Sequence, residues 1–476
     1  DKTFLEQASK HFNDDEKNKL ARNAVTATKL EDIIINRELV QKHNRIFSNF
    51  INVKTKPSNQ KRSGRCWLFA LCNMIRLKMI KLYKLEEPSD FEISQAYLFF
   101  YDILEKSNHF LHLISKFSEE EVNSRMNYFI LREPISDGGN WNMILNIINK
   151  YGLVPKTSFD ESFTSENTYN LDYFLSNKLR DYAFAIRNIK KSKHKEFIEK
   201  CMKEVYRILV IFMGEPPTEI TWEFMGNNNY KIIKNISPVD FYKKCVPINL
   251  NDYIILSDNP IQKYYTNFTI DNFNNMKDGV EINYVNVPCD DIKKCVKRAL
   301  DSGEPLWFGC DVGKYLEKTK GILDIDMINY RNVFNTDISL NKKYRLVYLS
   351  SDITHAMLLR GYDNQNMIVP CNKSKSKKDN KPKNRKKSQK GGAKNKTKKC
   401  RGQKKSSNNP VSKYLVENSW GKSDIDENIV MTSKYFEEYC YIVAVPKKFV
   451  TNKIKAVSKR KPDRLNLWDP FGYLLF

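Results

Sequence analysis

The chain has 476 residues, of which 41% are hydrophobic and 29% are charged, and its mean hydropathy is −0.59. This composition supports a large buried core and excludes a mini-protein, a collagen-like chain and a disordered chain. No apolar run approaches the roughly 20 residues that span a membrane, and the first residues lack the basic-then-apolar order of a signal peptide. Ten scattered cysteines form no Cys-x-x-Cys motif. We therefore expect no membrane insertion and a reducing, cytoplasmic location.

The net charge of +24 is concentrated in one segment. Between Lys373 and Lys405 there are 17 Lys or Arg residues against the single Asp379, a net +16, which leaves +8 for the rest of the chain. Residues 373–408 contain almost no apolar side chain, so burial cannot offset the entropy of ordering them. We expect a disordered polybasic insertion. It either binds nucleic acid or another polyanion, or is a solubilising loop without a partner.

The first third of the chain is predicted to be helical. Apolar positions recur at helical spacing within the first 60 residues, and the segment from Cys66 to about Leu85 is apolar on nearly every side, which is typical of a buried central helix. A second helical stretch follows Ser89-Asp90 and runs to about Phe117. Asp137-Gly138-Gly139-Asn140 opens a third, which Gly152 closes.

The periodicity changes towards the C-terminus. Residues 156–297 mix amphipathic helices with short aromatic and β-branched runs and show no recognisable chemistry, which indicates an architectural role. After Gly303 come short strand-like runs bounded by turn residues, at 306–312, 354–362, 414–420 and 439–445. We predict an antiparallel sheet there.

Cys66 is the candidate nucleophile. It follows a glycine turn at the first turn of the buried helix, where the partial positive charge and unpaired N–H groups of a helix N-terminus favour thiolate over thiol. Gln60 lies six residues upstream, so its side-chain NH2 and the Cys66 N–H can both point at a developing oxyanion.

A thiolate also needs a proton partner, and His355 is the histidine best placed for it. His355 stands in a strand-like run, whereas the other five histidines occupy polar, helix-like surroundings (His11, His43, His109, His112 and His194). Asn418 can accept a hydrogen bond from the imidazole and fix its tautomer, and Trp420 can shield that bond from water. His109 and His112 are three residues apart but have no third ligand nearby in sequence, so we expect no metal and no cofactor.

These residues resemble papain-fold cysteine peptidases, and among them the bleomycin hydrolase family of cytosolic cysteine aminopeptidases. The general likeness rests on Gln60, Cys66-Trp67, His355 and Asn418-Ser419-Trp420-Gly421. Five motifs in the family's order carry the narrower likeness: Ser63 to Ala70, Ile93 to Phe100, Asp137 to Trp141, Trp307 to Gly313 and Thr354 to Met357. Two features depart from the family pattern, the polybasic insertion and the positive pair Lys61-Arg62 beside the cleft.

The resemblance implies an α+β papain-like fold that cleaves N-terminal residues from peptide substrates, a homohexamer, and a C-terminal arm that enters the cleft and places the terminal carboxylate of Phe476 near the substrate. A nucleic-acid-binding protein with secondary or lost peptidase activity is the alternative. The chain then divides into an N-terminal helical segment (1–59), a helical half with the catalytic cysteine (60–155), a helical insertion or oligomerisation region (156–300), a sheet half with the catalytic His and Asn (301–454, including the insertion 373–408) and a C-terminal arm (455–476).

Overall fold

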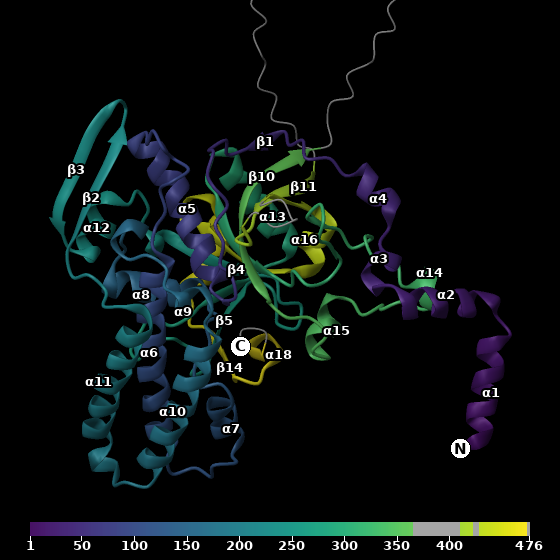
Figure 1. Ribbon diagram of the computed structural model, residues 1–476, viewed down its shortest axis with the longest axis horizontal. Helices are drawn as coiled ribbons and strands as arrows, with labels where there is room; N and C mark the ends of the chain where they lie inside the picture. Colours follow the sequence, from purple (N-terminus) through teal and green to yellow (C-terminus); the bar gives the residue numbers. More distant parts are fainter. Residues whose placement is uncertain (365–409, 422–427, 474–476) are drawn as a thin grey trace, which may run out of the picture.

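The structure is a computed structural model that describes residues 1–364, 410–421 and 428–473. The polybasic insertion at 373–408 and Phe476 therefore lie outside the described residues. The predicted α+β fold is confirmed. A helical half stands against a half built on a large sheet, and the last described residues lie between them (Figure 1).

The α-helices of the described residues are α1 (Lys2–Asn13), α2 (Glu16–Ala27), α3 (Leu30–Ile34), α4 (Arg37–Lys42), α5 (Cys66–Tyr83), α6 (Gln95–Lys116), α7 (Arg125–Arg132), α8 (Trp141–Tyr151), α9 (Phe163–Glu166), α10 (Tyr169–Arg187), α11 (His194–Met213), α12 (Pro238–Cys245), α13 (Cys289–Asp301), α14 (Arg331–Phe334), α15 (Lys342–Val347), α16 (Ser433–Tyr439), α17 (Asn452–Ser458) and α18 (Pro470–Tyr473). None of them is long and apolar enough to cross a membrane.

The strands are β1 (Asn49–Phe50), β2 (Ile220–Gly226), β3 (Asn229–Ile236), β4 (Tyr253–Ser257), β5 (Thr266–Ile270), β6 (Tyr284–Asn286), β7 (Leu306–Cys310), β8 (Leu316–Glu317), β9 (Ile322–Leu323), β10 (His355–Asn364), β11 (Val411–Glu417), β12 (Asn428–Thr432), β13 (Cys440–Pro446) and β14 (Asp463–Leu465). Twelve of them form one sheet in the order β14-β5-β6-β4-β13-β7-β10-β11-β12-β9-β8, with β1 paired to β10, while β2 and β3 form a separate hairpin.

The helix boundaries follow local capping chemistry. The Ser94 hydroxyl accepts the Tyr97 N–H at 3.0 Å, which starts α6 at Gln95, five residues after the Ser89-Asp90 turn. The Asn140 side chain accepts the N–H groups of Asn142 and Met143 and so starts α8. Gly152, with φ +76°, follows its last residue. The polar residues between the apolar runs therefore set where these helices begin and end.

The sheet is mixed, which corrects the expectation of a purely antiparallel one. Its centre, from β4 through β13, β7 and β10 to β12, is antiparallel, but three pairs are parallel: β12 with β9, β14 with β5 and β4 with β6. Strands β4, β5 and β6 come from the region between the helical half and Gly303, so that region extends the sheet as well as contributing helices.

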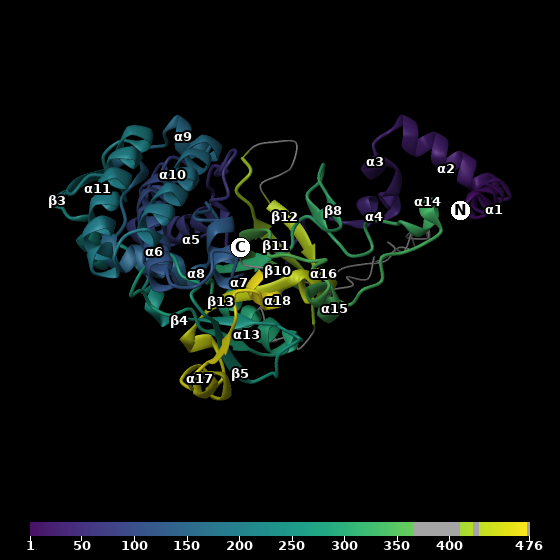
Figure 2. The ribbon, with the colours of Figure 1, turned by 90° about the horizontal axis from the view of Figure 1, so that it is seen from below.

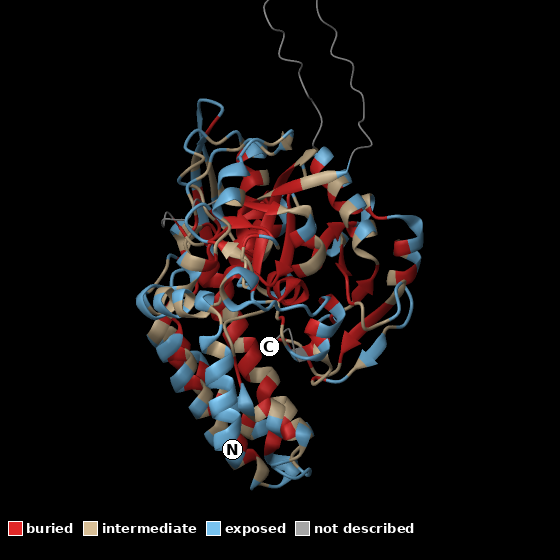
Figure 3. Cartoon of the chain, turned by 90° about the vertical axis from the view of Figure 1, so that its right-hand side faces the viewer, coloured by how far each residue is buried: buried red, intermediate tan, exposed pale blue. Residues whose placement is uncertain are grey.

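The buried residues concentrate in the sheet and on the helices that face it (Figure 3). Helix α5 is buried on nearly all sides, as its sequence predicts, and it packs between the other helices and the sheet. Behind the loop of Asn418, the Glu417 carboxylate accepts hydrogen bonds from Arg360 (2.7 Å) and Arg76 (3.5 Å), and all three side chains are buried. This ionic group joins α5 to β10 and β11.

The N-terminal helices stand apart from this core. Helices α1 and α2 contain no buried residue and project from the body beside α14 (Figures 1 and 2). Several of their apolar side chains are exposed, including Phe4, Leu5 and Leu20. Helix α2 touches α14, but buried contact with the body begins at α3, where Ile34 is buried and the following Ile35 pairs with Ile328.

Candidate active site

Cys66 is the first residue of α5, as the sequence predicts, and its thiol lies at the start of β10. The Ala356 N–H donates to the Cys66 sulfur at 3.4 Å, although the two residues are 290 positions apart in the chain. Burial raises the pKa of the thiol to about 11, against the lowering effect of the N–H groups of Ala356, Trp67 and Cys66 itself. The fold thus directs N–H donors at a sulfur that burial keeps protonated.

His355 begins β10 and is oriented by Asn418, which follows β11. The His355 Nε2 and the Asn418 Oδ1 lie 2.7 Å apart, so the amide oxygen accepts the Nε2 proton and leaves Nδ1 free to take another. The Trp420 ring packs on the imidazole at a centroid distance of 5.0 Å. Burial lowers the pKa of His355 to about 4, while the hydrogen bond to Asn418 acts in the opposite direction.

The two pKa shifts have the same physical origin. Burial penalises a lone thiolate at Cys66 and a lone imidazolium at His355, because either would be an uncompensated charge away from water. A proton that moves from the sulfur to the imidazole creates both ions at once, and their attraction offsets part of that penalty. The arrangement therefore favours proton transfer within the pair over ionisation of either group alone.

Gln60 is held in place by the loop of Asn418 and by its own turn. Its N–H donates to the Ser419 carbonyl at 2.8 Å, and its side-chain oxygen accepts the Ser419 hydroxyl at 2.6 Å. Its side-chain nitrogen donates one hydrogen to the Ser63 carbonyl at 2.6 Å. Since an amide NH2 has two hydrogens, the second is left for an oxyanion.

Sequence reasoning missed the residue that supports the cysteine turn, Asp137. Its carboxylate accepts the Gly64 N–H and the Thr168 hydroxyl, and its carbonyl accepts the Trp67 indole N–H at 2.9 Å. Two contacts thus tie the residues before and after Cys66 to Asp137, and a third ties Asp137 to Thr168. The Asp-Gly-Gly-Asn motif was recognised in the sequence as the start of a helix and as part of the family resemblance, but not as a support of the cysteine turn.

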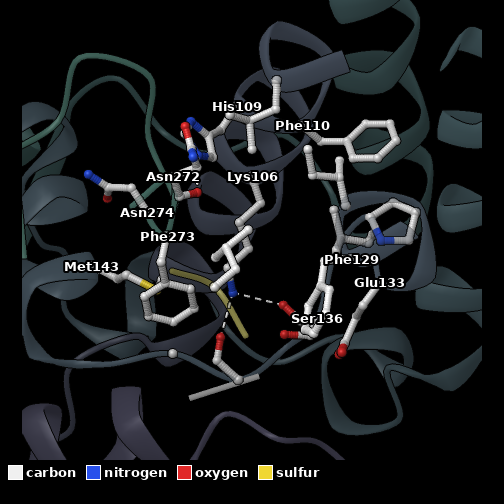
Figure 4. A pocket seen from close by; sticks show the side chains of 17 residues that line it. Lys106, His109, Phe110, Phe129, Glu133, Ser136, Met143, Asn272, Phe273 and Asn274 are labelled. Atoms are coloured by element: carbon white, nitrogen blue, oxygen red, sulfur yellow. Dashed lines mark hydrogen bonds between the residues drawn. The ribbon is translucent and has the colours of Figure 1, made fainter. Parts of the chain in front are cut away.

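A small apolar cavity of about 80 Å³ lies beside the same Asp137 loop (Figure 4). Lys106 reaches from α6 to the loop and donates to the carbonyls of Ser136 (2.8 Å) and Gly138, and it also pairs with Asp102. Gly139 lines the cavity and packs closely on the Trp67 ring, where an added Cβ would lie 2.7 Å from the indole. The loop therefore has fixed contacts with both Lys106 and Trp67.

Three of the other histidines make ordinary structural contacts. His109 Nε2 contacts the Asn272 carbonyl at 3.2 Å and His194 contacts the Ser115 hydroxyl at 2.9 Å. His43 pairs with Asp324 at 2.9 Å. In the part of the chain that the structure describes, no three His, Cys, Asp or Glu residues are grouped so that they could hold a metal ion.

Comparisons with known proteins identify the family of this chain. Residues 1–381 and 390–472 match the Peptidase C1-like family. The chain belongs to this family. It is 33% identical to bleomycin hydrolase of Gallus gallus over 470 residues, covering 96% of this chain and 94% of that protein. It is 35% identical to aminopeptidase C of Listeria innocua over 436 residues, covering 90% and 88%.

A solved structure is similar to this chain over the whole fold. The crystal structure of pepw from Lactobacillus rhamnosis HN001 superimposes with a TM-score of 0.86 at 30% identity and covers 98% of this chain and 97% of that one. The expected resemblance to bleomycin hydrolases is confirmed, and the chain is a member of this group of cysteine-type aminopeptidases. One relative, at 31% identity, is named a mitochondrial cysteine proteinase of Saccharomyces cerevisiae.

Proposed function

We propose that this protein removes N-terminal residues from peptides and amides by nucleophilic attack of Cys66, with His355 as its proton partner and Asn418 as the residue that orients the imidazole. The observation that carries this proposal is the meeting of the three at the junction of α5 with the sheet. There the Cys66 sulfur accepts the Ala356 N–H, and the preceding His355 is hydrogen-bonded to Asn418.

The reaction follows from these contacts. His355 takes the thiol proton at Nδ1, and the sulfur attacks the carbonyl carbon of the scissile bond. The free hydrogen of the Gln60 amide and the Cys66 N–H stabilise the resulting oxyanion. His355 then gives its proton to the departing amine, and water, activated by the same imidazole, hydrolyses the acyl-enzyme. The residues need no metal or cofactor for these steps.

The decisive experiment compares amide hydrolysis by the wild type and by three variants. We expect Cys66→Ala and His355→Ala to abolish turnover of amino-acid amides, and Asn418→Ala to leave a fraction, because Asn418 orients the imidazole but transfers no proton. Cys289→Ser is a matched control, since Cys289 is a free, partly exposed thiol on α13. Wild-type turnover by Cys66→Ala would disprove the assignment.

We also propose that the C-terminal arm confers aminopeptidase specificity by pairing its terminal carboxylate with the α-ammonium group of the substrate. The described part of the arm is anchored between the two halves. Phe471 is buried against Phe268 and Tyr284 of the sheet half, and Trp468 packs under Arg125 of α7, at 4.6 Å. Phe476 itself lies outside the described residues.

Truncation tests the role of the arm. Removing residues 472–476 moves the terminal carboxylate back to Phe471, five residues from its natural position, and leaves the Phe471 anchor. We expect it to lower cleavage of substrates with a free N-terminus and to raise cleavage of N-blocked ones, because the arm both pairs with the amine and fills that side of the cleft. An unchanged ratio of the two rates would exclude this role.

A second candidate function is binding of nucleic acid or another polyanion through Lys373 to Lys405, which carry a net +16. The strands on either side are adjacent, since Asn364 pairs with Val411 in the β10–β11 hairpin. Deleting residues 374–407 should therefore preserve peptidase activity. Binding to nucleic acid, if it depends on this segment, should fall together with its salt dependence, whose slope is about −0.9 per contacted phosphate. Equal, salt-insensitive binding by both proteins would exclude the role.

We further propose that the chain assembles into a homohexamer in a reducing, cytoplasmic compartment. Exposed apolar side chains on α1 and α2, which have no buried residue in the single chain, support association with other copies. The eight cysteines within the described residues are all free thiols, which agrees with a reducing environment. Native mass spectrometry of the full chain and of a variant lacking residues 1–28 tests the assembly, and a monomeric wild type would refute it.

A further inference from the structure

Two positive side chains, Lys61 and Arg62, stand directly after the oxyanion residue Gln60. Both residues are exposed. Within residues 1–364, 410–421 and 428–473, neither side chain has a hydrogen bond, an ion pair or a ring contact, although most buried and many exposed cations of this protein have one. Among the described residues, therefore, no side chain neutralises these two charges beside the catalytic loop.

The main chain under these charges is fixed. The Lys61 N–H donates to the Asn59 side chain at 2.9 Å, and Lys61 adopts a left-handed φ of +54°, a conformation that glycine reaches more easily. The Arg62 N–H donates to the Glu166 carbonyl at 3.0 Å, and its carbonyl accepts the Thr168 N–H. The two side chains can change rotamer, whereas hydrogen bonds hold the main chain that carries them.

The neighbours of the loop show on which side of the scissile bond the charges lie. His355 must stand on the side of the departing amine, because it donates the proton to that amine. Trp420 packs on His355, and Asn59 pairs with Trp420 as an isolated bridge, while Gln60 is bonded to Ser419. Asn59 therefore lies on the leaving-group side, and because the Lys61 N–H is bonded to the Asn59 side chain, we infer that Lys61 projects from the same side.

We propose that Lys61 and Arg62 make the enzyme prefer substrates whose departing fragment carries a carboxylate near the scissile bond. That carboxylate is either the free C-terminus of a dipeptide or tripeptide, or an Asp or Glu side chain in the first two residues after the bond. This inference rests on the proposed function of the same site. Since the pair is exposed to solvent, each charge contributes about two- to fivefold in kcat/KM at low salt, and the effect is screened as salt rises.

The experiment measures kcat/KM for matched substrates that share one N-terminal residue. One arm compares an Asp with an Asn after the scissile bond, both with amidated C-termini, and the other compares a free with an amidated C-terminus. The proteins are the wild type, Lys61→Gln, Arg62→Gln and the double variant. Lys61→Gly also removes the charge and suits the left-handed φ, so it tests the same prediction if Lys61→Gln folds poorly. Lys200→Gln is the matched control, because Lys200 is an exposed lysine of α11 and its replacement removes one positive charge elsewhere.

We expect the wild type to prefer at least one carboxylate-bearing substrate over its neutral partner, most strongly at low salt. The double variant should reduce that ratio to near one, whereas Lys200→Gln should keep it, and the arm that responds identifies the carboxylate. A wild-type ratio at or below one in both arms, or a ratio that the double variant leaves unchanged, would overturn the inference. Failure of the wild type to cleave any of these substrates would instead refute the proposed function.

Discussion

Replacing Glu417 with alanine tests whether the buried ionic group behind Asn418 holds the two halves of the site together. The Glu417 carboxylate is the shared partner of Arg76 and Arg360, and the exposed fractions of the three residues are 4%, 1% and 7%. Among the described residues, removing it leaves the Arg360 guanidinium in the interior without an anion and leaves Arg76 with Glu92 alone, at 3.8 Å. Loss of one partner from a buried ion pair costs about 3–5 kcal/mol, a large part of the stability of a folded domain.

We expect Glu417→Ala to lower the free energy of unfolding by about 3–5 kcal/mol, measured by urea denaturation. Activity should also fall in native conditions, because Asn418 is the next residue. Glu438→Ala is the matched control: its carboxylate also binds an arginine, Arg345, at 2.7 Å, but it is 39% exposed, and the arginine keeps backbone partners in both cases. That change should cost at most about 1 kcal/mol. Equal, small losses in both variants would refute the reasoning.

Two further predictions concern residues beside the Asp137 loop. Burial and the nearby Asp137 charge raise the pKa of Asp172 from 3.8 to about 7, so the folded state binds this proton more tightly and stability falls as pH rises from about 4 to 7. Asp172→Asn should therefore stabilise the protein by about 1–3 kcal/mol at pH 8 and by little at pH 4; equal melting-temperature shifts at both pH values would contradict this. Gly139→Ala places a Cβ 2.7 Å from the buried Trp67 ring and should destabilise by about 1–3 kcal/mol, whereas at Gly138 the nearest atom is 3.8 Å away. Urea denaturation should give a lower free energy of unfolding for Gly139→Ala than for Gly138→Ala. Equal losses would show that the loop can shift to accommodate the added Cβ.

Local sequence signals were enough to predict the helices that carry the site. The apolar run after Cys66 predicts a buried α5, and the polar residues before Trp141 and the glycine after Tyr151 predict both ends of α8. The residues Cys66, His355 and Asn418 were identified from motifs and from a family resemblance, and the structure brings them together.

Features that depend on distant pairing could not be predicted in this way. Strands β4 to β6 look like other short apolar runs, and nothing in their sequence shows that they extend the main sheet or that β4 and β6 run parallel. The Glu417 group joins residues from three separate parts of the chain, so no local pattern reveals it. Local sequence does not reveal the role of Asp137 either, since its partners Gly64 and Thr168 lie far from it in sequence.

The most direct test of the central claim is to trap the acyl-enzyme. The wild type is mixed with an amino-acid ester that has a free α-amine, quenched in acid within the first turnover and analysed by intact-mass and peptide mass spectrometry. We expect one aminoacyl group per chain, bound as a thioester to the peptide that contains Cys66 and absent from Cys66→Ala. Hydrolysis of the ester without any covalent adduct, or an adduct on another of the free cysteines, would contradict it.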